Sequence, residues 1–175
     1  MVSTTESRLA AARRIAARIP DPELPMVTVA DLGILRDIRT DDGSLVVTIT
    51  PTYSGCPALT EIARGLHGAL TEAGLGPVTV RTALAPAWTT DWITAEGRRK
   101  LAAAGVAPPG PARSGEARRG PVPLTLSPGP RRDGVLCPLC GSARTELTAA
   151  FSGTACKALR RCLSCGEPFE QVKEL

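Results

Sequence analysis

Apolar residues recur at intervals of three and four positions in two long stretches of the chain, and this spacing predicts two amphipathic helices. The first covers residues 3–18, where Ser3 and Glu6 have the spacing of a capping box at the amino end. The second covers residues 57–73 and begins with a proline, which suits the first helical turn. A shorter helix is expected over residues 94–104.

Alternation of apolar and polar residues predicts three strands, over residues 34–40, 45–50 and 78–84. The sequence Asp41-Asp42-Gly43 joins the first two strands and is a strong hairpin signal, because Asp and Gly tolerate the positive φ angles of a tight turn. Helices and strands together predict an α+β domain over residues 1–104. Trp88 and Trp92 lie near its end, and we expect at least one to pack in the core, the alternative being a contact with a partner.

The composition changes sharply after this domain. Residues 105–134 contain seven prolines and six glycines in 30 positions, which leaves too little apolar surface to offset the entropy of ordering. A long Pro/Gly/Arg-rich linker is therefore predicted. This linker carries five arginines and two carboxylates, a net charge of +3, which is most of the chain's net charge of +4. Because the basic charge is concentrated in a solvated linker, it does not indicate a nucleic-acid partner, and we expect none.

The chain has no apolar run near the roughly 20 residues that span a bilayer, so no membrane association is expected. Charged residues interrupt residues 1–18, which excludes the apolar core of a signal peptide. The cytoplasm is the expected location, and there the six cysteines favour metal binding or thiol chemistry over disulfides.

Four of these cysteines form two C-x-x-C-G pairs near the carboxyl end: Cys137, Cys140, Cys162 and Cys165. A gap of two residues lets both sulfurs of a turn face one ion, and four thiolates suit a tetrahedral metal such as zinc. The 21 residues between the pairs leave room for a hairpin with strands over 145–151 and 157–162. Residues 135–175 are thus predicted to be a four-cysteine zinc ribbon that needs its metal to fold. Iron in a rubredoxin-type site is the alternative.

Cys56 is the second candidate site. It precedes Pro57 at the predicted start of a helix, where the helix dipole and free N–H groups lower the pKa of a thiol. Such a thiolate suits metal or cluster ligation, and the alternative is a packed side chain. The only histidine, His67, lies 11 positions further on, about 16 Å along a helix, so a Cys–His catalytic pair is not expected.

Three carboxylates and one further cysteine are weaker candidates. Asp21, Glu23 and Asp31 are expected to cap loops or, alternatively, to donate an oxygen ligand to iron. Cys156 is a fifth cysteine of the ribbon and is surplus to a four-ligand site. It is expected to be a packed residue, or else a reactive thiol beside Lys157.

Several sequence blocks are similar to known families. Residues 21–25 (DPELP), 31–38 (DLGILRDI) and 55–57 (GCP) resemble the iron–sulfur assembly domain of cytosolic iron–sulfur targeting and SufT-type proteins. Residues 50–58, 86–92 and 151–157, with the four-cysteine ribbon, are similar to the family of D subunits of phenylacetyl-CoA epoxidases. The resemblance implies a compact two-layer α/β first domain.

The resemblance also implies an accessory function in aerobic phenylacetate catabolism. In that family the oxygenase and the iron–sulfur, flavin-containing reductase are other subunits, and these are the expected partners. The D subunit is expected to assist the assembly of their metal centres, with no catalysis of its own. Cys56 would hold iron or an iron–sulfur cluster transiently, and because one thiolate is too few for a cluster, this hypothesis includes a homodimer. The competing hypotheses are a rubredoxin-like electron carrier and a zinc-ribbon interaction or regulatory module.

Overall fold

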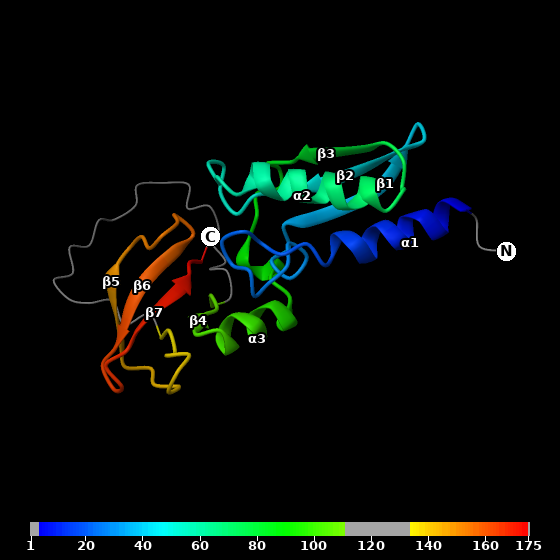
Figure 1. Ribbon diagram of the computed structural model, residues 1–175. Helices are drawn as coiled ribbons and strands as arrows, with labels where there is room; N and C mark the ends of the chain where they lie inside the picture. Colours follow the sequence, from blue (N-terminus) through cyan, green and yellow to red (C-terminus); the bar gives the residue numbers. More distant parts are fainter. Residues whose placement is uncertain (1–3, 111–133, 175) are drawn as a thin grey trace. The chain divides into compact units, whose positions relative to one another are not determined.

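The computed structural model describes residues 4–110 and 134–174 (Figure 1). The chain divides into two compact units, Met1–Ala104 and Gly105–Leu175, which are described separately below. Ser3 of the predicted capping box and residues 111–133 of the predicted linker lie outside the described ranges. None of the described helices is long and apolar enough to cross a bilayer.

The first unit contains a three-stranded sheet with the order β1-β2-β3. Its strands are β1 (Leu35–Asp41), β2 (Ser44–Ile49) and β3 (Val78–Thr82). β1 and β2 pair antiparallel through a turn in which Asp42 and Gly43 have φ angles of 45° and 77°, so the predicted hairpin is confirmed. β3 pairs parallel with β2, which requires a crossover connection.

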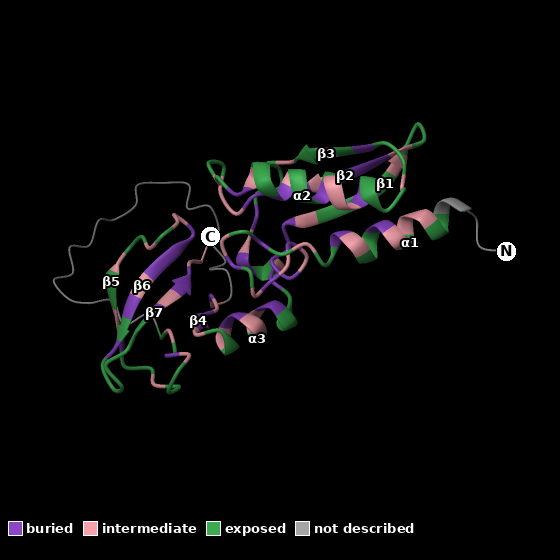
Figure 2. Cartoon of the chain, viewed as in Figure 1, coloured by how far each residue is buried: buried purple, intermediate pink, exposed green. Residues whose placement is uncertain are grey.

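Helix α2 (Leu59–Glu72) provides that crossover, and helix α1 (Thr4–Ala16) packs beside it. α2 contacts β3, and α1 contacts β1 and α2, so the helices form one layer and the sheet the other (Figure 1). The apolar face of α2, with Ile62, Leu66 and Leu70, is buried, and β2 is the most continuously buried strand of this unit (Figure 2). The two-layer α/β fold implied by the family resemblance is therefore confirmed.

A second apolar cluster lies between the loop before β1 and the end of the unit. The last part of the unit consists of a short 3-10 helix, η1 (Thr90–Trp92), and helix α3 (Ala95–Ala103). Trp88 is buried in this cluster, and its Nε1 donates a hydrogen bond of 2.9 Å to the carbonyl oxygen of Leu32. The prediction that one tryptophan packs in the core is correct for Trp88.

The second unit is a four-stranded sheet with the order β4-β7-β6-β5. Its strands are β4 (Val106–Ala107), β5 (Thr145–Ala149), β6 (Lys157–Cys162) and β7 (Pro168–Val172). β5 and β6 form the hairpin predicted between the cysteine pairs, and β7 continues it antiparallel. No strand was predicted from the sequence at the position of β7.

The start of the predicted linker is wrong. Val106 and Ala107 form β4, which pairs parallel with Glu170 and Gln171 of β7, and both residues of β4 are buried. The proline and glycine content of the whole segment concealed these two apolar residues, which satisfy their backbone groups on the edge of a distant strand. The ribbon unit therefore begins about 30 residues earlier in the chain than the sequence indicated.

Candidate metal centre

Two turns of the same geometry bring the four ribbon cysteines together. In the first turn the N–H of Gly141 donates to the carbonyl oxygen of Cys137 at 2.9 Å, and in the second the N–H of Gly166 donates to that of Cys162 at 3.0 Å. Both glycines have positive φ angles, 73° and 83°, which an L side chain adopts only with strain. The glycine after each C-x-x-C pair therefore turns the chain back.

The sulfur positions suit a tetrahedral ion. The four Sγ atoms of the ribbon lie within 4.8 Å of one another. Two cross-turn pairs are closer, with 3.5 Å between Cys140 and Cys162 and 3.9 Å between Cys137 and Cys165. A tetrahedron with metal–sulfur bonds of about 2.3 Å has edges of about 3.8 Å. The four cysteines therefore form a metal-binding site with a complete set of protein ligands.

Backbone groups already favour negative charge at one of these sulfurs. The N–H groups of Cys165 and Ser164 lie 3.5 and 3.4 Å from Sγ of Cys162 and lower the pKa of this thiol to about 6. A hydrogen bond from the Ser142 backbone acts to lower the pKa of Cys140, but the contact with Cys162 and burial outweigh it and raise that pKa to about 12. A metal ion bound between these sulfurs would favour their thiolate form, because thiols bind a metal after losing their protons.

The metal site is also the centre of the ribbon's small core. Cys137 and Cys162 are buried with Ala107 and Phe169, and Val135 packs against them. Cys140 and Cys165 are exposed. Because few apolar residues surround the sulfurs in this core, an ion bound by them would supply a large part of the cohesion of this unit, as in a structural site.

Cys156 lies outside this group, as expected for a surplus cysteine. It is buried in the turn before β6, and its Sγ is 3.1 Å from Oγ1 of Thr154. Among residues 4–110 and 134–174, the four-cysteine set is the only group of three or more Cys, His, Asp or Glu residues whose ligand atoms lie within 4.8 Å of one another.

Cys56 lies in the loop that joins β2 to α2, where it is half-buried. Its N–H donates to the carbonyl oxygen of Tyr53 at 3.2 Å, and its own carbonyl oxygen accepts from the N–H of Leu59 at 3.3 Å. The helix begins later than predicted, with Ala58 as its N-cap and no side-chain cap. The position of Cys56 next to the N-cap is therefore wrong by one residue, because a turn intervenes before the helix.

The loop that carries Cys56 also forms one wall of a pocket that was not predicted from the sequence. This pocket has a volume of about 140 Å³ and lies where the parallel strands β2 and β3 end. Thr50 to Ser54 line one side, and Leu84, Ala87 and Trp88 line the other. The blocks 50–58 and 86–92, about 30 positions apart, are thus adjacent in the fold.

Two of the three candidate carboxylates are engaged in capping loops. Oδ1 of Asp21 accepts hydrogen bonds from the N–H groups of Glu23 and Leu24 at 2.9 and 2.8 Å, and so caps the proline-rich loop to which Glu23 belongs. Oδ2 of Asp31 accepts from the N–H of Thr28 at 3.0 Å and lies 2.7 Å from Nζ of Lys100. For Asp21 and Asp31 these contacts match the loop-capping alternative.

The charge of Asp31 is stabilised by its partners. Burial raises the pKa of this carboxyl, but the hydrogen bonds from Lys100 and Thr28 outweigh burial, and the pKa lies below its usual value. Lys100 belongs to α3, 69 positions away, and no local sequence signal linked the two residues. Asp31 thus anchors α3 on the loop before β1.

Sequence comparisons assign both units. A family described as "Iron-sulfur cluster assembly protein" matches residues 10–82, and one described as "PaaD zinc beta ribbon domain" matches residues 124–173. A solved structure from Bacillus anthracis, a domain of unknown function DUF59, has the fold of the first unit. It is 24% identical, with a TM-score of 0.52, and the match covers 56% of this chain and 94% of that one.

The fold and the four-cysteine site thus define an iron–sulfur assembly-type domain joined to a zinc ribbon. A protein of Escherichia coli strain K12, named as the putative D subunit of 1,2-phenylacetyl-CoA epoxidase, is 41% identical over 159 residues, which cover 91% of this chain and 88% of that protein. The chain belongs to this family of D subunits of phenylacetyl-CoA epoxidases.

Proposed function

We propose that this protein is a non-catalytic accessory factor of a multicomponent phenylacetyl-CoA epoxidase and assists the assembly of iron or iron–sulfur centres in its partner subunits. Membership of the D-subunit family supports the pathway, and the match of residues 10–82 to iron–sulfur assembly proteins supports the type of activity. The partners are the oxygenase and the reductase subunits of the epoxidase, and the assembly of their metal centres takes place in the cytoplasm.

Cys56 is the residue to which we assign iron or cluster handling. The observation that carries this assignment is its half-buried thiol on the loop at the carboxyl ends of β2 and β3, beside a pocket. In residues 4–110 and 134–174, Cys56 does not belong to a group of three or more potential metal ligands, and such a thiol suits transient rather than permanent binding. Two copies of the chain would supply two thiols, so a homodimer is part of the proposal. Asp21 and Asp31 cap the loops before β1 and are not assigned as ligands.

The ribbon has a different task. Zinc held by Cys137, Cys140, Cys162 and Cys165 would leave no open position for a substrate, because all four sites of a tetrahedral ion are filled by protein. We therefore assign zinc a structural function, in which it shapes a surface that recognises the partner subunits.

The proposal is tested by reconstituting the metal-free reductase with ferrous iron and sulfide in the absence of oxygen. The wild-type protein is expected to accelerate the appearance of the cluster absorption, and Cys56→Ala is expected to lose most of that acceleration. Cys156→Ala is the matched control, since it makes the same chemical change at a buried thiol outside the loop. Far-UV circular dichroism and zinc content confirm that both variants fold.

The same pair of variants is applied to iron loading of the metal-free oxygenase. The proposed function would be contradicted if the wild-type protein accelerated metal loading of neither the reductase nor the oxygenase. It would also be contradicted if wild type and Cys56→Ala accelerated the loading of both equally.

A further inference from the structure

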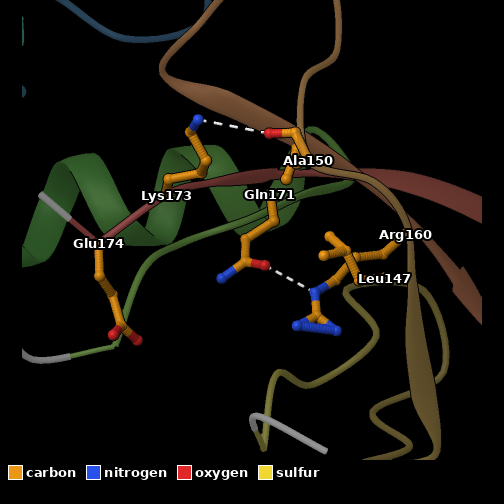
Figure 3. Close-up of a pocket in the computed structure, with 7 residues that line it drawn as sticks. Leu147, Ala150, Arg160, Gln171, Lys173 and Glu174 are labelled. Carbon is orange, nitrogen blue, oxygen red and sulfur yellow. Dashed lines mark hydrogen bonds between the residues drawn. The ribbon is translucent and has the colours of Figure 1, made fainter. Parts of the chain in front are cut away.

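One face of the ribbon sheet is covered at one end and open at the other. Ala158, Arg160 and Cys162 alternate along β6 and face the same side. At the Cys162 end this face is covered by the metal-site core. At the Ala158 end it opens as a pocket of about 220 Å³, whose lining residues come from β5, β6, β7 and the residues directly after β5 and β7 (Figure 3).

A buried arginine forms the floor of this pocket. The side chain of Arg160 is 1% exposed and is the largest of the fully buried side chains in the described residues. Its Nε donates a hydrogen bond of 2.6 Å to Oε1 of Gln171, and Nη1 lies 3.5 Å from Oγ1 of Thr145. Because Oε1 accepts from Arg160, the other end of the Gln171 amide is its NH2 group, which can only donate.

Lys173 adds a second positive charge at the upper edge of the pocket. Its Nζ donates to the carbonyl oxygen of Ala150 at 3.3 Å and lies 4.3 Å from the centre of the Phe151 ring. Figure 3 shows the Lys173 side chain directed toward Ala150, with Glu174 on the opposite side of Gln171 from Arg160. The ammonium group of Lys173 at the edge of the pocket favours an anionic group there.

The rim of the pocket is apolar and exposed. Leu147 and Phe151 are 47% and 65% exposed, and they belong to the six large apolar side chains that are exposed in the described residues. Leu147 lies on β5, the last strand in the sheet order, which in the described part of the chain pairs with β6 alone. The outer edge of β5 can therefore pair with a further strand.

We propose that β5 and this pocket are the docking site for an extended, acidic segment of a partner subunit. The segment adds to the edge of β5, places an apolar side chain on Leu147 and Phe151, and directs a carboxylate to Lys173. The positive charge of Lys173 favours an acidic side chain in the segment, and the free edge of β5 in the described part of the chain favours an extended conformation. The inference deepens the proposed function, because it takes the epoxidase reductase and oxygenase as partners.

The test measures the binding of purified reductase and oxygenase to the full-length, zinc-loaded chain. Lys173→Glu is expected to weaken the Kd about tenfold, since it places like charges together. Arg144→Glu, with the same change in charge at an exposed position of the same unit outside the pocket, is expected to change the Kd less than about twofold. Zinc content and thermal midpoint confirm that both variants fold.

Hydrogen exchange of the complex locates the contact. The amides of β5 are expected to exchange more slowly in the complex, together with one acidic segment of the partner. A synthetic peptide of that segment should bind the wild-type chain, and the same peptide with Lys in place of its acidic residues should not. Equal weakening by both variants, unchanged exchange at β5, or protection of β5 by a second copy of this chain alone would overturn the docking proposal.

Different measurements test the docking site and the proposed function: binding affinity tests the first, and metal loading tests the second. If Lys173→Glu binds normally while Cys56→Ala still abolishes metal loading, the docking site is wrong and the function stands. If Lys173→Glu weakens binding while Cys56→Ala loads the clients normally, the docking site stands and the function of Cys56 is wrong.

Discussion

The indole Nε1 of Trp88 donates a hydrogen bond of 2.9 Å to the carbonyl oxygen of Leu32, 56 positions earlier in the chain. Both residues are buried, so this bond satisfies a donor and an acceptor that water does not reach. It connects the block 86–92 to the loop before β1. Trp88 also lines the pocket beside the Cys56 loop, so the bond positions one wall of that site.

Trp88→Phe is expected to destabilise the first unit by about 1–3 kcal/mol, because it leaves a buried carbonyl group without its donor. Trp92→Phe is the matched control. Trp92 is half-buried, and its ring lies under the guanidinium of Arg36, 3.4 Å from the ring centre, a contact that phenylalanine retains. Urea unfolding followed by far-UV circular dichroism measures the unfolding free energy of both variants. An equal loss of unfolding free energy in the two variants would contradict a stabilising effect of the Trp88 hydrogen bond.

Gly33 and Gly43 provide a second matched pair. Both have positive φ, 70° and 77°, but a Cβ atom at Gly33 would lie 2.6 Å from the carbonyl oxygen of Trp92, whereas a Cβ at Gly43 would meet nothing within 4 Å. Gly43→Ala should cost about 1–2 kcal/mol for the backbone conformation. Gly33→Ala should cost about 1–3 kcal/mol more, because η1 must move. The difference between the thermal midpoints of the two variants measures the cost of the close approach of residue 33 to Trp92. Similar midpoints would show that η1 moves away without cost.

The ion pair of Asp31 and Lys100 predicts a specific dependence of stability on pH. The folded state lowers the pKa of Asp31 below its usual value of 3.8, so the stabilisation is complete above that value and is lost as pH falls through the lower, folded pKa. Asp31→Asn should therefore reduce the unfolding free energy by about 1–3 kcal/mol at pH 7. The difference from wild type should shrink in strong acid.

The control for this prediction is Glu96→Gln. Glu96 forms an ion pair with Arg99 on the exposed side of the same helix, 2.6 Å between Nη2 and Oε1, where water screens the charges. At every pH measured, the unfolding free energy of Glu96→Gln should be close to that of the wild-type protein. If the difference in unfolding free energy between Asp31→Asn and wild type stays constant down to the lowest pH, the ion pair is not the cause of that difference.

The ribbon should depend on its metal for its fold. Cys140→Ser is expected to reduce the metal content from about one ion per chain to a small fraction and to melt the second unit, because four ligands are needed to close the site. Cys156→Ser should retain the ion, since Cys156 lies outside the four-cysteine group. Elemental analysis and the absorption spectrum of protein purified without oxygen measure the amount and identity of the metal, and colourless protein with zinc supports the structural assignment.

Acid should release the ion from the wild-type ribbon, because protons compete with the metal for the thiolates. A strong chelator should have the same effect at neutral pH, with loss of the β structure of the second unit and little change in the first. A second unit that keeps its structure after complete removal of the ion would contradict the structural function of the metal.

Some features of this protein follow from short stretches of sequence. The two C-x-x-C-G turns, the Asp42-Gly43 hairpin and the helical periodicity of α2 involve residues a few positions apart, and the covalent chain alone holds such residues close together. For the same reason the four-cysteine site could be predicted to the residue. The resemblance of separate blocks to a known family added the identity of both domains.

Other features exist only because distant segments meet. Neither Lys100 nor Gln171 has a local pattern that names its partner, yet one holds Asp31 and the other holds Arg160. β4 was concealed in a proline-rich segment and forms only on the edge of β7. The burial of a charge or the pairing of a strand depends on the whole packed structure, so these contacts, the pocket beside Cys56 and the open face of the ribbon became visible only in three dimensions.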